Sequence, residues 1–147
     1  MKNKISVLND NHLIQTLITE ELTEEGYDVF SAVAGSHVVD LIRGQRPDLV
    51  VLDYNPRGSD SKGLMHNIKK SFPELPIVLW TTYPFMIKSI KFIGAHHYVY
   101  KSSDFTPLKL EIKLALEGVQ SYQKPYAPYR EDRASSAEFE FSEAKEI

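Results

Sequence analysis

Five short apolar segments alternate with stretches of helical periodicity, and this alternation is the feature that most restricts the fold. The apolar segments are residues 5–8, 27–32, 48–53, 75–80 and 97–100. The stretches with helical spacing are residues 12–26, 36–44, 61–72, 84–94 and 106–119. Apolar strands that alternate with helices are typical of a parallel sheet covered on both faces. Because an eight-fold barrel needs about 250 residues, we predict an α/β fold with an open, doubly wound five-stranded parallel sheet.

Cap residues set the expected helix boundaries. Gly26 and Gly44 favour the C-terminal ends of the first two helices, and Ser36 is a candidate cap at the start of the second. Thr106 is the expected N-cap of the last helix, with Pro107 at its first helical position.

The expected domain spans residues 1–119, and residues 120–147 form a tail of different character. The tail holds four Lys and Arg against six Asp and Glu, and its tyrosines interleave with Pro125 and Pro128. Such a segment is either weakly structured or an extended partner-binding stretch. It is too short for a helix-turn-helix domain of ordinary size, so we expect the chain to act through protein contacts.

Composition excludes several classes of function. The chain has no cysteine, which rules out disulfides and thiolate sites, and its net charge of -3 does not favour nucleic acid as a partner. The apolar run at residues 5–8 is too short for a signal peptide, and no stretch reaches the ~18 apolar residues of a membrane helix. We therefore expect a cytoplasmic protein with no membrane partner.

Polar residues follow four of the expected strands. Asn9 and Asp10 follow the first strand, Asp53 ends the third, Thr81 follows the fourth and Lys101 the fifth. The carboxyl ends of parallel strands share one edge of the sheet, where ligands bind. Two carboxylates suit Mg²⁺, which prefers oxygen ligands, and an ammonium and a hydroxyl can neutralise a phosphoryl group. The set indicates phosphoryl transfer onto a carboxylate.

Four segments carry a resemblance to a known family: "VLND", "PDLVVLD", "PIVLWTT" and "GAHHYVYK". From residue 4 to about residue 119 the sequence resembles the receiver domains of bacterial two-component response regulators. The resemblance implies a flavodoxin-like (βα)5 receiver fold and a phosphoacceptor in a two-component or phosphorelay system. It implies a signalling protein rather than an enzyme with multiple turnover.

The resemblance also implies a role for each site residue. Asp53 would accept phosphate from a sensor histidine kinase or a histidine phosphotransfer protein, and Lys101 would pair with the phosphoryl group. Thr81 would donate its hydroxyl to the phosphoryl group, and Tyr98 would be the coupled switch aromatic. The implied Mg²⁺ ligands are Asp10, Asp53 and the backbone carbonyl of Asn55, with Asn9 as a weak or outer-shell contributor.

The implied signalling surface is formed by the helix expected at 84–94, the strand at 97–100 and the helix at 106–119. Phosphorylation adds about -1.5 to -2 charge and biases a two-state loop arrangement toward one state. This surface would dock an unidentified downstream protein, and homodimerisation through it is also compatible with the resemblance.

Four positions depart from the family pattern. Asn9 replaces one carboxylate, which is expected to weaken Mg²⁺ binding, and Pro56 comes one residue early, before a lengthened loop. Thr82 stands where the family prefers a very small residue, which would narrow access to the site. Ser102 replaces the proline that usually follows the lysine, which would leave that loop less rigidly set.

Two alternatives follow from these departures. The first is a degenerate receiver that binds partners without phosphate. The second is a Mg²⁺-dependent phosphotransfer enzyme of the Asp-x-Asp type, which is disfavoured because Asn55 stands where the second carboxylate would be and an amide cannot shuttle a proton.

The histidines do not form a recognisable metal site. Neighbouring residues of an extended segment point to opposite faces, so we expect His96 and His97 to lie in a surface loop. His12 is interpreted as a helix-start residue.

Overall fold

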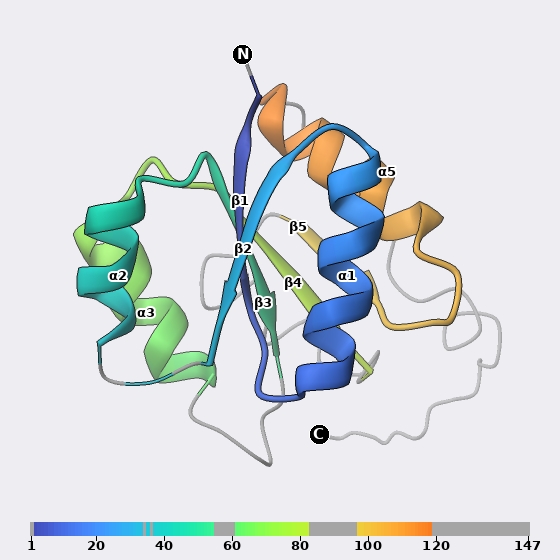
Figure 1. The fold of residues 1–147 in the computed structure, drawn as a ribbon. Coiled ribbons are helices and arrows are strands. Elements are labelled where there is room, and N and C mark those ends of the chain that lie inside the picture. Colours follow the sequence, from blue (N-terminus) through green and yellow to red (C-terminus); the bar gives the residue numbers. More distant parts are fainter. Residues whose placement is uncertain (1, 34, 36, 55–60, 83–96, 119–147) are drawn as a thin grey trace, which may run out of the picture.

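The computed structural model describes residues 2–33, 35, 37–54, 61–82 and 97–118, apart from the side chains of residues 61 and 62 (Figure 1). Its elements are β1 (Lys4–Leu8), α1 (His12–Glu24), β2 (Asp28–Ala32), α2 (Val38–Gln45), β3 (Leu49–Asp53), α3 (Ser61–Ser71), β4 (Ile77–Thr81), β5 (His97–Tyr100) and α5 (Thr106–Leu116). All strand pairs are parallel, in the order β2-β1-β3-β4-β5. The predicted doubly wound parallel sheet is confirmed.

The helices cover both faces of the sheet. Helices α2 and α3 lie on one face, and α1 and α5 lie on the other (Figure 1). On the first face, Met65 and Ile68 of α3 are fully buried against the sheet. On the second, Ile18 of α1 and Ile112 of α5 are fully buried. Each such burial contributes about 2 kcal/mol to stability. The sheet is therefore packed between two separate hydrophobic clusters, one on each face.

Helix α1 follows its sequence signals closely. The Asn11 side chain caps its first turn by accepting the N–H of Ile14 at 3.2 Å. Gly26 follows the C-cap with φ +98°, and the N–H of Tyr27 returns to the carbonyl of Leu22. This left-handed position favours glycine, so the predicted helix end is explained.

Three predicted helix boundaries are wrong. Helix α2 begins at Val38 rather than Ser36, continues through Gly44 and ends before Arg46, which takes the left-handed conformation with φ 55°. Pro47 follows immediately and cannot continue a helix. The N-cap of α5 is Phe105 rather than Thr106, because the Asp104 side chain accepts the N–H of Thr106 at the start of the helix.

Other predicted elements lie outside the described residues. These are the helix expected at 84–94, the loop around Pro56 and the tail from residue 119 onward. Within the part of the chain that the structure describes, no helix is long and apolar enough to span a membrane.

Candidate functional site

Strand register aligns the predicted site residues at one edge of the sheet. Leu8 of β1 pairs with Leu52 of β3, so Asn9 lies level with Asp53 and Asp10 lies one residue beyond. On the other side, Asp53 pairs with Trp80 of β4. The carboxyl ends of β1, β3, β4 and β5 therefore meet where the sequence predicted a site.

Asp53 and Lys101 form an ion pair across this edge. The Nζ atom of Lys101 lies 2.5 Å from Oδ1 of Asp53, and the two side chains are 26% and 20% exposed. The backbone N–H of Lys101 also donates to the carbonyl of Thr81 at 2.7 Å. A cation is thus fixed beside a carboxylate that remains open to solvent, as transfer of a phosphoryl group onto the carboxylate requires.

The loop after β1 is held from inside by two amides. Asn9 is buried, and its Oδ1 accepts the N–H of Asn11 at 2.7 Å. Gln15 of α1 donates from Nε2 to the carbonyl of Asn9 and, at 3.1 Å, to that of Ala32. These bonds leave Asp10 exposed at the mouth of the site. The amide oxygen of Asn9 therefore has a structural role in the loop.

Sequence reasoning missed the contribution of Gln15. The buried face of α1 is formed by Gln15, Ile18 and Leu22. A polar residue in line with buried apolar residues at helical spacing was the available signal, because a buried amide needs hydrogen-bond partners.

The donor set fits Mg²⁺ better than a transition metal. Within the described residues, no group of three or more His, Cys, Asp or Glu side chains is arranged to hold a metal. Asp10 and Asp53 provide two carboxylates at adjacent strand ends, and Mg²⁺ typically binds one or two carboxylates and keeps several waters. The carbonyl of Asn55, predicted as a further ligand, lies outside the described residues.

Thr81 and Tyr98 lie on the opposite side of the sheet edge from Asp53. Side chains alternate along a strand, so Thr81 faces away from its neighbour Trp80, and both Thr81 and Tyr98 are buried. Burial raises the pKa of Tyr98, and the carboxylate of Glu111 raises it further. Tyr98 belongs to the cluster beneath α2 and α3 and packs edge-on against Tyr100. Thr82 is exposed at the end of β4.

The comparisons with known proteins agree with this geometry. The sequence pattern of the response regulator receiver domain family matches residues 5–113. This chain belongs to that family. Sporulation initiation phosphotransferase F of Bacillus subtilis is 30% identical over 115 residues, which cover 77% of this chain and 93% of that protein.

Two solved structures of another response regulator are also similar. TrrA of Thermotoga maritima in complex with Mg²⁺-BeF superposes with a TM-score of 0.70 and 33% identity, over 79% of this chain and 99% of that one. TrrA in complex with the histidine kinase ThkA gives a TM-score of 0.69 at 33% identity, over 79% of this chain and 98% of that one. The expected family and receiver fold are confirmed.

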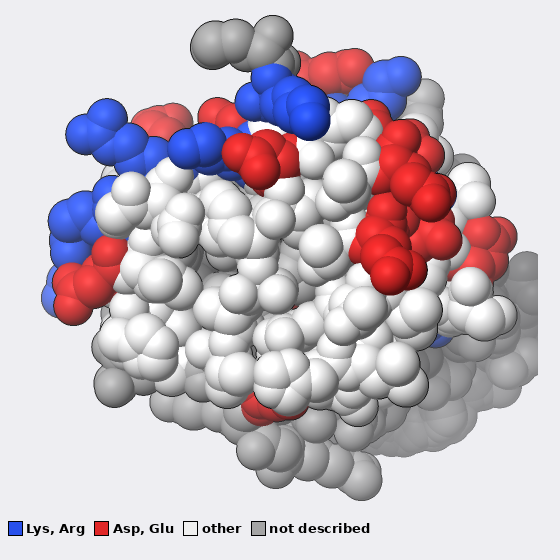
Figure 2. Space-filling model, viewed as in Figure 1, with Lys and Arg blue, Asp and Glu red and all other residues white. Residues whose placement is uncertain are grey.

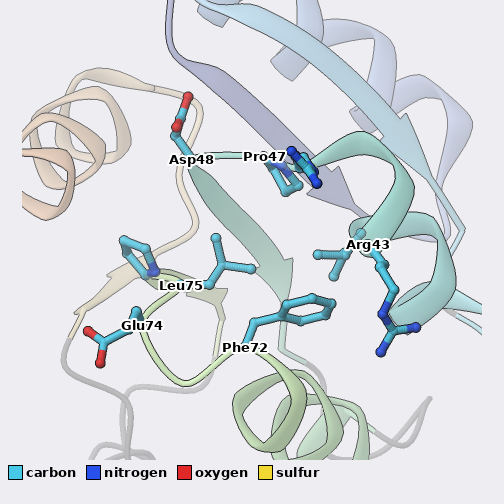
Figure 3. Close-up of a pocket in the computed structure, with 9 residues that line it drawn as sticks. Arg43, Pro47, Asp48, Phe72, Glu74 and Leu75 are labelled. Atoms are coloured by element: carbon cyan, nitrogen blue, oxygen red, sulfur yellow. The ribbon is translucent and has the colours of Figure 1, made fainter.

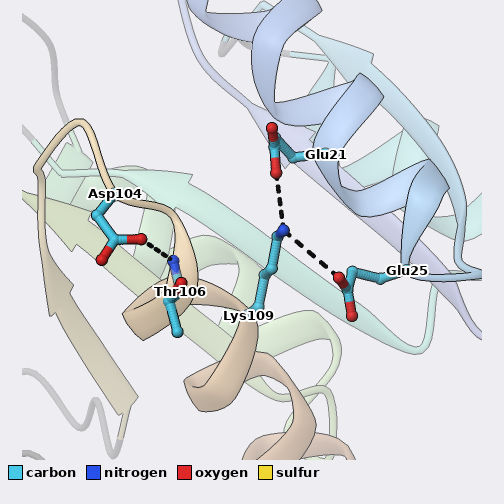
Figure 4. A network of polar contacts seen from close by, with 5 residues as sticks. All are labelled: Glu21, Glu25, Asp104, Thr106 and Lys109. Atoms are coloured by element: carbon cyan, nitrogen blue, oxygen red, sulfur yellow. Dashed lines mark hydrogen bonds and ion pairs between the residues drawn. The ribbon is translucent and has the colours of Figure 1, made fainter.

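The loop after Lys101 is ordered by hydrogen bonds in this receiver. The Ser102 hydroxyl donates to the carbonyl of Asp104 at 2.9 Å, and Ser102 Oγ accepts the N–H of Asp104 at 3.2 Å. Asp104 Oδ1 then accepts the N–H of Thr106 at 3.0 Å (Figure 4). This bond is the largest cause of the lowered pKa of Asp104. Asp104 thus takes the capping role predicted for Thr106, and Ser102 restrains the loop in place of a proline.

A buried hydrogen bond joins β5 to α5. His97 Nδ1 and Glu111 Oε2 are 2.7 Å apart, with side chains 11% and 0% exposed. The prediction that His97 lies in a surface loop is wrong: the residue begins β5 and is buried there because Glu111 of α5 provides a partner. His96 lies outside the described residues. His12 is exposed at the start of α1, as predicted.

Helices α1 and α5 are linked by a further network. Lys109 Nζ of α5 lies 2.7 Å from Glu21 Oε1 and 3.4 Å from Glu25 Oε2 of α1 (Figure 4). The hydrogen bond to Glu21 is the largest cause of the raised pKa of Lys109. The network joins the two helices that cover one face of the receiver.

The two ends of α1 present different surfaces. Acidic residues gather over its C-terminal half, where Glu20, Glu24 and Glu25 are exposed, and much of the remaining face is uncharged (Figure 2). The N-terminal half, next to Asp10, exposes Leu13 (67%) and Leu17 (40%). An exposed apolar pair beside a functional site is typical of a protein-binding surface.

A pocket of about 480 Å³ lies away from the site. It is lined by Ile42, Arg43, Arg46, Pro47, Asp48, Phe72, Glu74, Leu75 and Pro76 (Figure 3). The lining residues come from the loops that lead into β3 and β4 and from the adjoining ends of α2 and α3. Asp53 is at the other end of β3, so this pocket does not contribute to the phosphoacceptor site.

Proposed function

We propose that this receiver accepts a phosphoryl group on Asp53, with Mg²⁺ bound by Asp10, Asp53 and the carbonyl of Asn55. The observation that carries the proposal is the 2.5 Å contact between Asp53 and Lys101 at the carboxyl end of β3. Bound Mg²⁺ would supply charge neutralisation for the incoming phosphoryl group. Lys101 carries the remaining share of that stabilisation and stays paired with the new phosphate oxygens.

The conformational response is assigned to Thr81 and Tyr98. The Thr81 hydroxyl turns toward the phosphoryl oxygens, and the buried Tyr98 ring repacks with it. Their burial supports this role, because a tightly packed core has a few discrete arrangements rather than a continuous range. The response reaches the surface formed by β5 and α5, where a downstream protein docks; the segment 84–94, which was expected to belong to this surface, lies outside the described residues.

A histidine kinase or a histidine phosphotransfer protein is the proposed donor. Exposed Leu13 and Leu17 on α1, next to Asp10, support a protein donor because they provide apolar contact area beside the acceptor. The relatives agree, since one is named a phosphotransferase and the other was solved with a histidine kinase. A single transfer per acceptor is expected, as in a signalling module rather than a catalyst.

One observation favours the degenerate receiver as a second candidate. Asn9 brings no charge, and its amide oxygen is already bonded to the N–H of Asn11. The metal site therefore has two carboxylates instead of three, and weak Mg²⁺ binding would leave the phosphoryl charge poorly neutralised. Such a receiver would bind its partners without phosphate.

Intact-mass measurement separates these candidates. The chain is incubated with Mg²⁺ and acetyl phosphate, and the proposal expects an adduct of about 80 Da, the mass of one phosphoryl group. Asp53→Asn should abolish the adduct. Asp104→Asn is the matched control, because it removes an exposed carboxylate near the site and keeps an oxygen for the helix cap; it should be modified like the wild type.

The other outcomes assign the alternatives. No adduct, under conditions that modify a typical receiver, would support the degenerate receiver. Multiple turnover of the phosphodonor, dependent on Asp53 and exceeding one event per chain, would support the enzyme. An adduct that persists in Asp53→Asn would move the acceptor to another residue and contradict the proposal.

A further inference from the structure

Lys101 is held between a carboxylate and an aromatic ring. Its Nζ atom, which pairs with Asp53, also lies 4.9 Å from the centroid of the Trp80 ring. Trp80 is 3% exposed. An ammonium within about 6 Å of an indole face is attracted by the ring quadrupole, and the attraction grows when the pair is shielded from water.

The sheet itself places the ring under the cation. Asp53 and Trp80 are direct register partners, and Trp80 pairs in turn with Val99 of β5. Lys101 follows Val99 by two residues, so alternation brings it to the same face of the sheet as Trp80. Two backbone hydrogen bonds hold the ends of these strands next to one another. The N–H of Tyr54 donates to the carbonyl of Trp80 at 2.9 Å, and the N–H of Lys101 donates to the carbonyl of Thr81 at 2.7 Å.

Packing keeps the Trp80 ring in one position. It belongs to the hydrophobic cluster beneath α1 and α5, which contains Val78, Leu108 and Ile112. The Phe105 ring lies 6.2 Å away at an interplanar angle of 43°. Phe105 is also the N-cap residue of α5, so the loop after Lys101 closes over the ring. The packed ring is therefore a rigid support for the Lys101 ammonium group.

An aromatic ring has a property here that other side chains lack. An aliphatic side chain would fill the same space but would leave the Lys101 ammonium free to move between rotamers. An acidic side chain would hold the ammonium but would compete with Asp53 and with the phosphoryl group for it. The indole attracts the cation and adds no net charge to the site.

We propose that Trp80 is a positioning residue for phosphoryl transfer, which holds the Lys101 ammonium over its ring so that the ammonium meets the oxygens of the phosphoryl group that is transferred to Asp53. This role rests on the proposed function, because it presumes that Asp53 is the acceptor. Trp80 in this role does not touch the reacting atoms, and it acts through Lys101.

The first test measures the contact without any phosphodonor. Trp80 is the chain's only tryptophan, so its fluorescence reports on this ring alone. Removing a cation from the ring face should change the position or intensity of the emission in Lys101→Met. Lys69→Met is the control, since Lys69 lies on α3 at the other face of the sheet; its emission should match the wild type. Unchanged emission in Lys101→Met overturns the proposal.

The second test measures rates of modification by acetyl phosphate with saturating Mg²⁺. Trp80→Leu should slow the reaction about 30-fold, the value of a shielded cation–π contact, and Trp80→Phe should restore most of the rate. Val78→Ala is the control for packing, because it removes atoms from the same strand and cluster but leaves the Trp80 ring and Lys101 unchanged. It should lower the melting temperature and leave the rate within about twofold.

A double substitution separates positioning from packing. If Trp80 acts through Lys101, Trp80→Leu should have no further effect on the rate in a Lys101→Met background. Additive effects in that background, or equal slowing by Val78→Ala, overturn the proposal. If the wild type accepts no phosphoryl group, the proposed function fails and the role of Trp80 in transfer fails with it. The emission comparison still decides whether the ring holds Lys101.

Discussion

Two side-chain pairs lie at the two ends of β5, and their surroundings differ. His97 begins the strand and pairs with Glu111 of α5, in a place where the carboxylate is fully buried. Lys101 follows the strand and pairs with Asp53, and these side chains are 26% and 20% exposed. The distances are similar, at 2.7 Å and 2.5 Å. The two pairs therefore differ in how far solvent reaches them, and not in the distance between the paired atoms.

The difference indicates which pair serves structure and which serves chemistry. A buried pair is costly to break because the polar group left behind cannot bond to water, so the pair ties β5 to α5. The pair at the sheet edge is partly exposed, so water can partly replace a lost partner and the expected contribution to stability is smaller. The partly exposed pair leaves Asp53 accessible to a phosphodonor, and Lys101 would stay paired with the phosphoryl oxygens after transfer, while the buried pair keeps the strand in register.

The largest expected effect comes from breaking the buried pair. Glu111→Ala should lower the free energy of unfolding by roughly 3 kcal/mol, because His97 loses its partner and a cavity is left. Chemical denaturation at neutral pH measures this. The double variant His97→Leu with Glu111→Leu should recover most of the loss, since apolar residues can replace a buried pair. A loss of less than about 1 kcal/mol in the free energy of unfolding of Glu111→Ala would contradict this prediction, because a loss that small is typical of an exposed ion pair.

The site pair should show the opposite behaviour. Lys101→Met should change the free energy of unfolding by about 1 kcal/mol or less, while the rate of phosphorylation by acetyl phosphate falls roughly 100-fold, the effect of removing one stabilising group from a transition state. Parallel denaturation and rate measurements check both values. A large stability loss with an unchanged rate would reverse the assignment of the two pairs.

A third variant adds charge at the open edge. Asn9→Asp should tighten Mg²⁺ binding roughly tenfold, because one carboxylate oxygen can keep the bond to the Asn11 N–H while the group brings a full negative charge. Calorimetric titration with Mg²⁺ measures the change. Asp40→Asn serves as a control, since that carboxylate lies on α2 and pairs with Arg43. Equal affinities in the wild type and Asn9→Asp would contradict the electrostatic account of this position.

The smallest expected effect concerns the loop that joins the two pairs. The pKa of Asp104 is lowered by the bond from the Thr106 N–H, so its contribution to stability is present above about pH 4, the unfolded value. The contribution is lost as the pH falls through the lower folded pKa. Asp104→Asn keeps a cap oxygen but does not titrate, so this part of the pH dependence of the melting temperature should vanish. An identical profile in the wild type and the variant would exclude Asp104 as its source.

Particular residues show how far sequence reasoning reached. The placement of Asp53, Thr81 and Lys101 at one edge of the sheet was predictable because each lies at the end of an apolar run, and parallel strands bring such positions together. Gly26 was predictable because a left-handed helix end favours glycine. The ends of α2 predicted from Ser36 and Gly44 were wrong because cap preferences are weak. The helix ends instead at Arg46, which takes the left-handed conformation just before Pro47. His97 misled because the partner that buries it is on another element.

The sequence alone determined the order of elements, the parallel sheet and the edge where the polar residues gather, since these depend on local periodicity and on where strands end. Tertiary structure alone decided the partners: Asn9 with the Asn11 N–H, His97 with Glu111, and Lys101 between Asp53 and Trp80. The physical reason is that burial and contact arise between segments far apart in the chain. Whether a charge is buried or open to water, and hence what it can do, is decided only when those segments pack together.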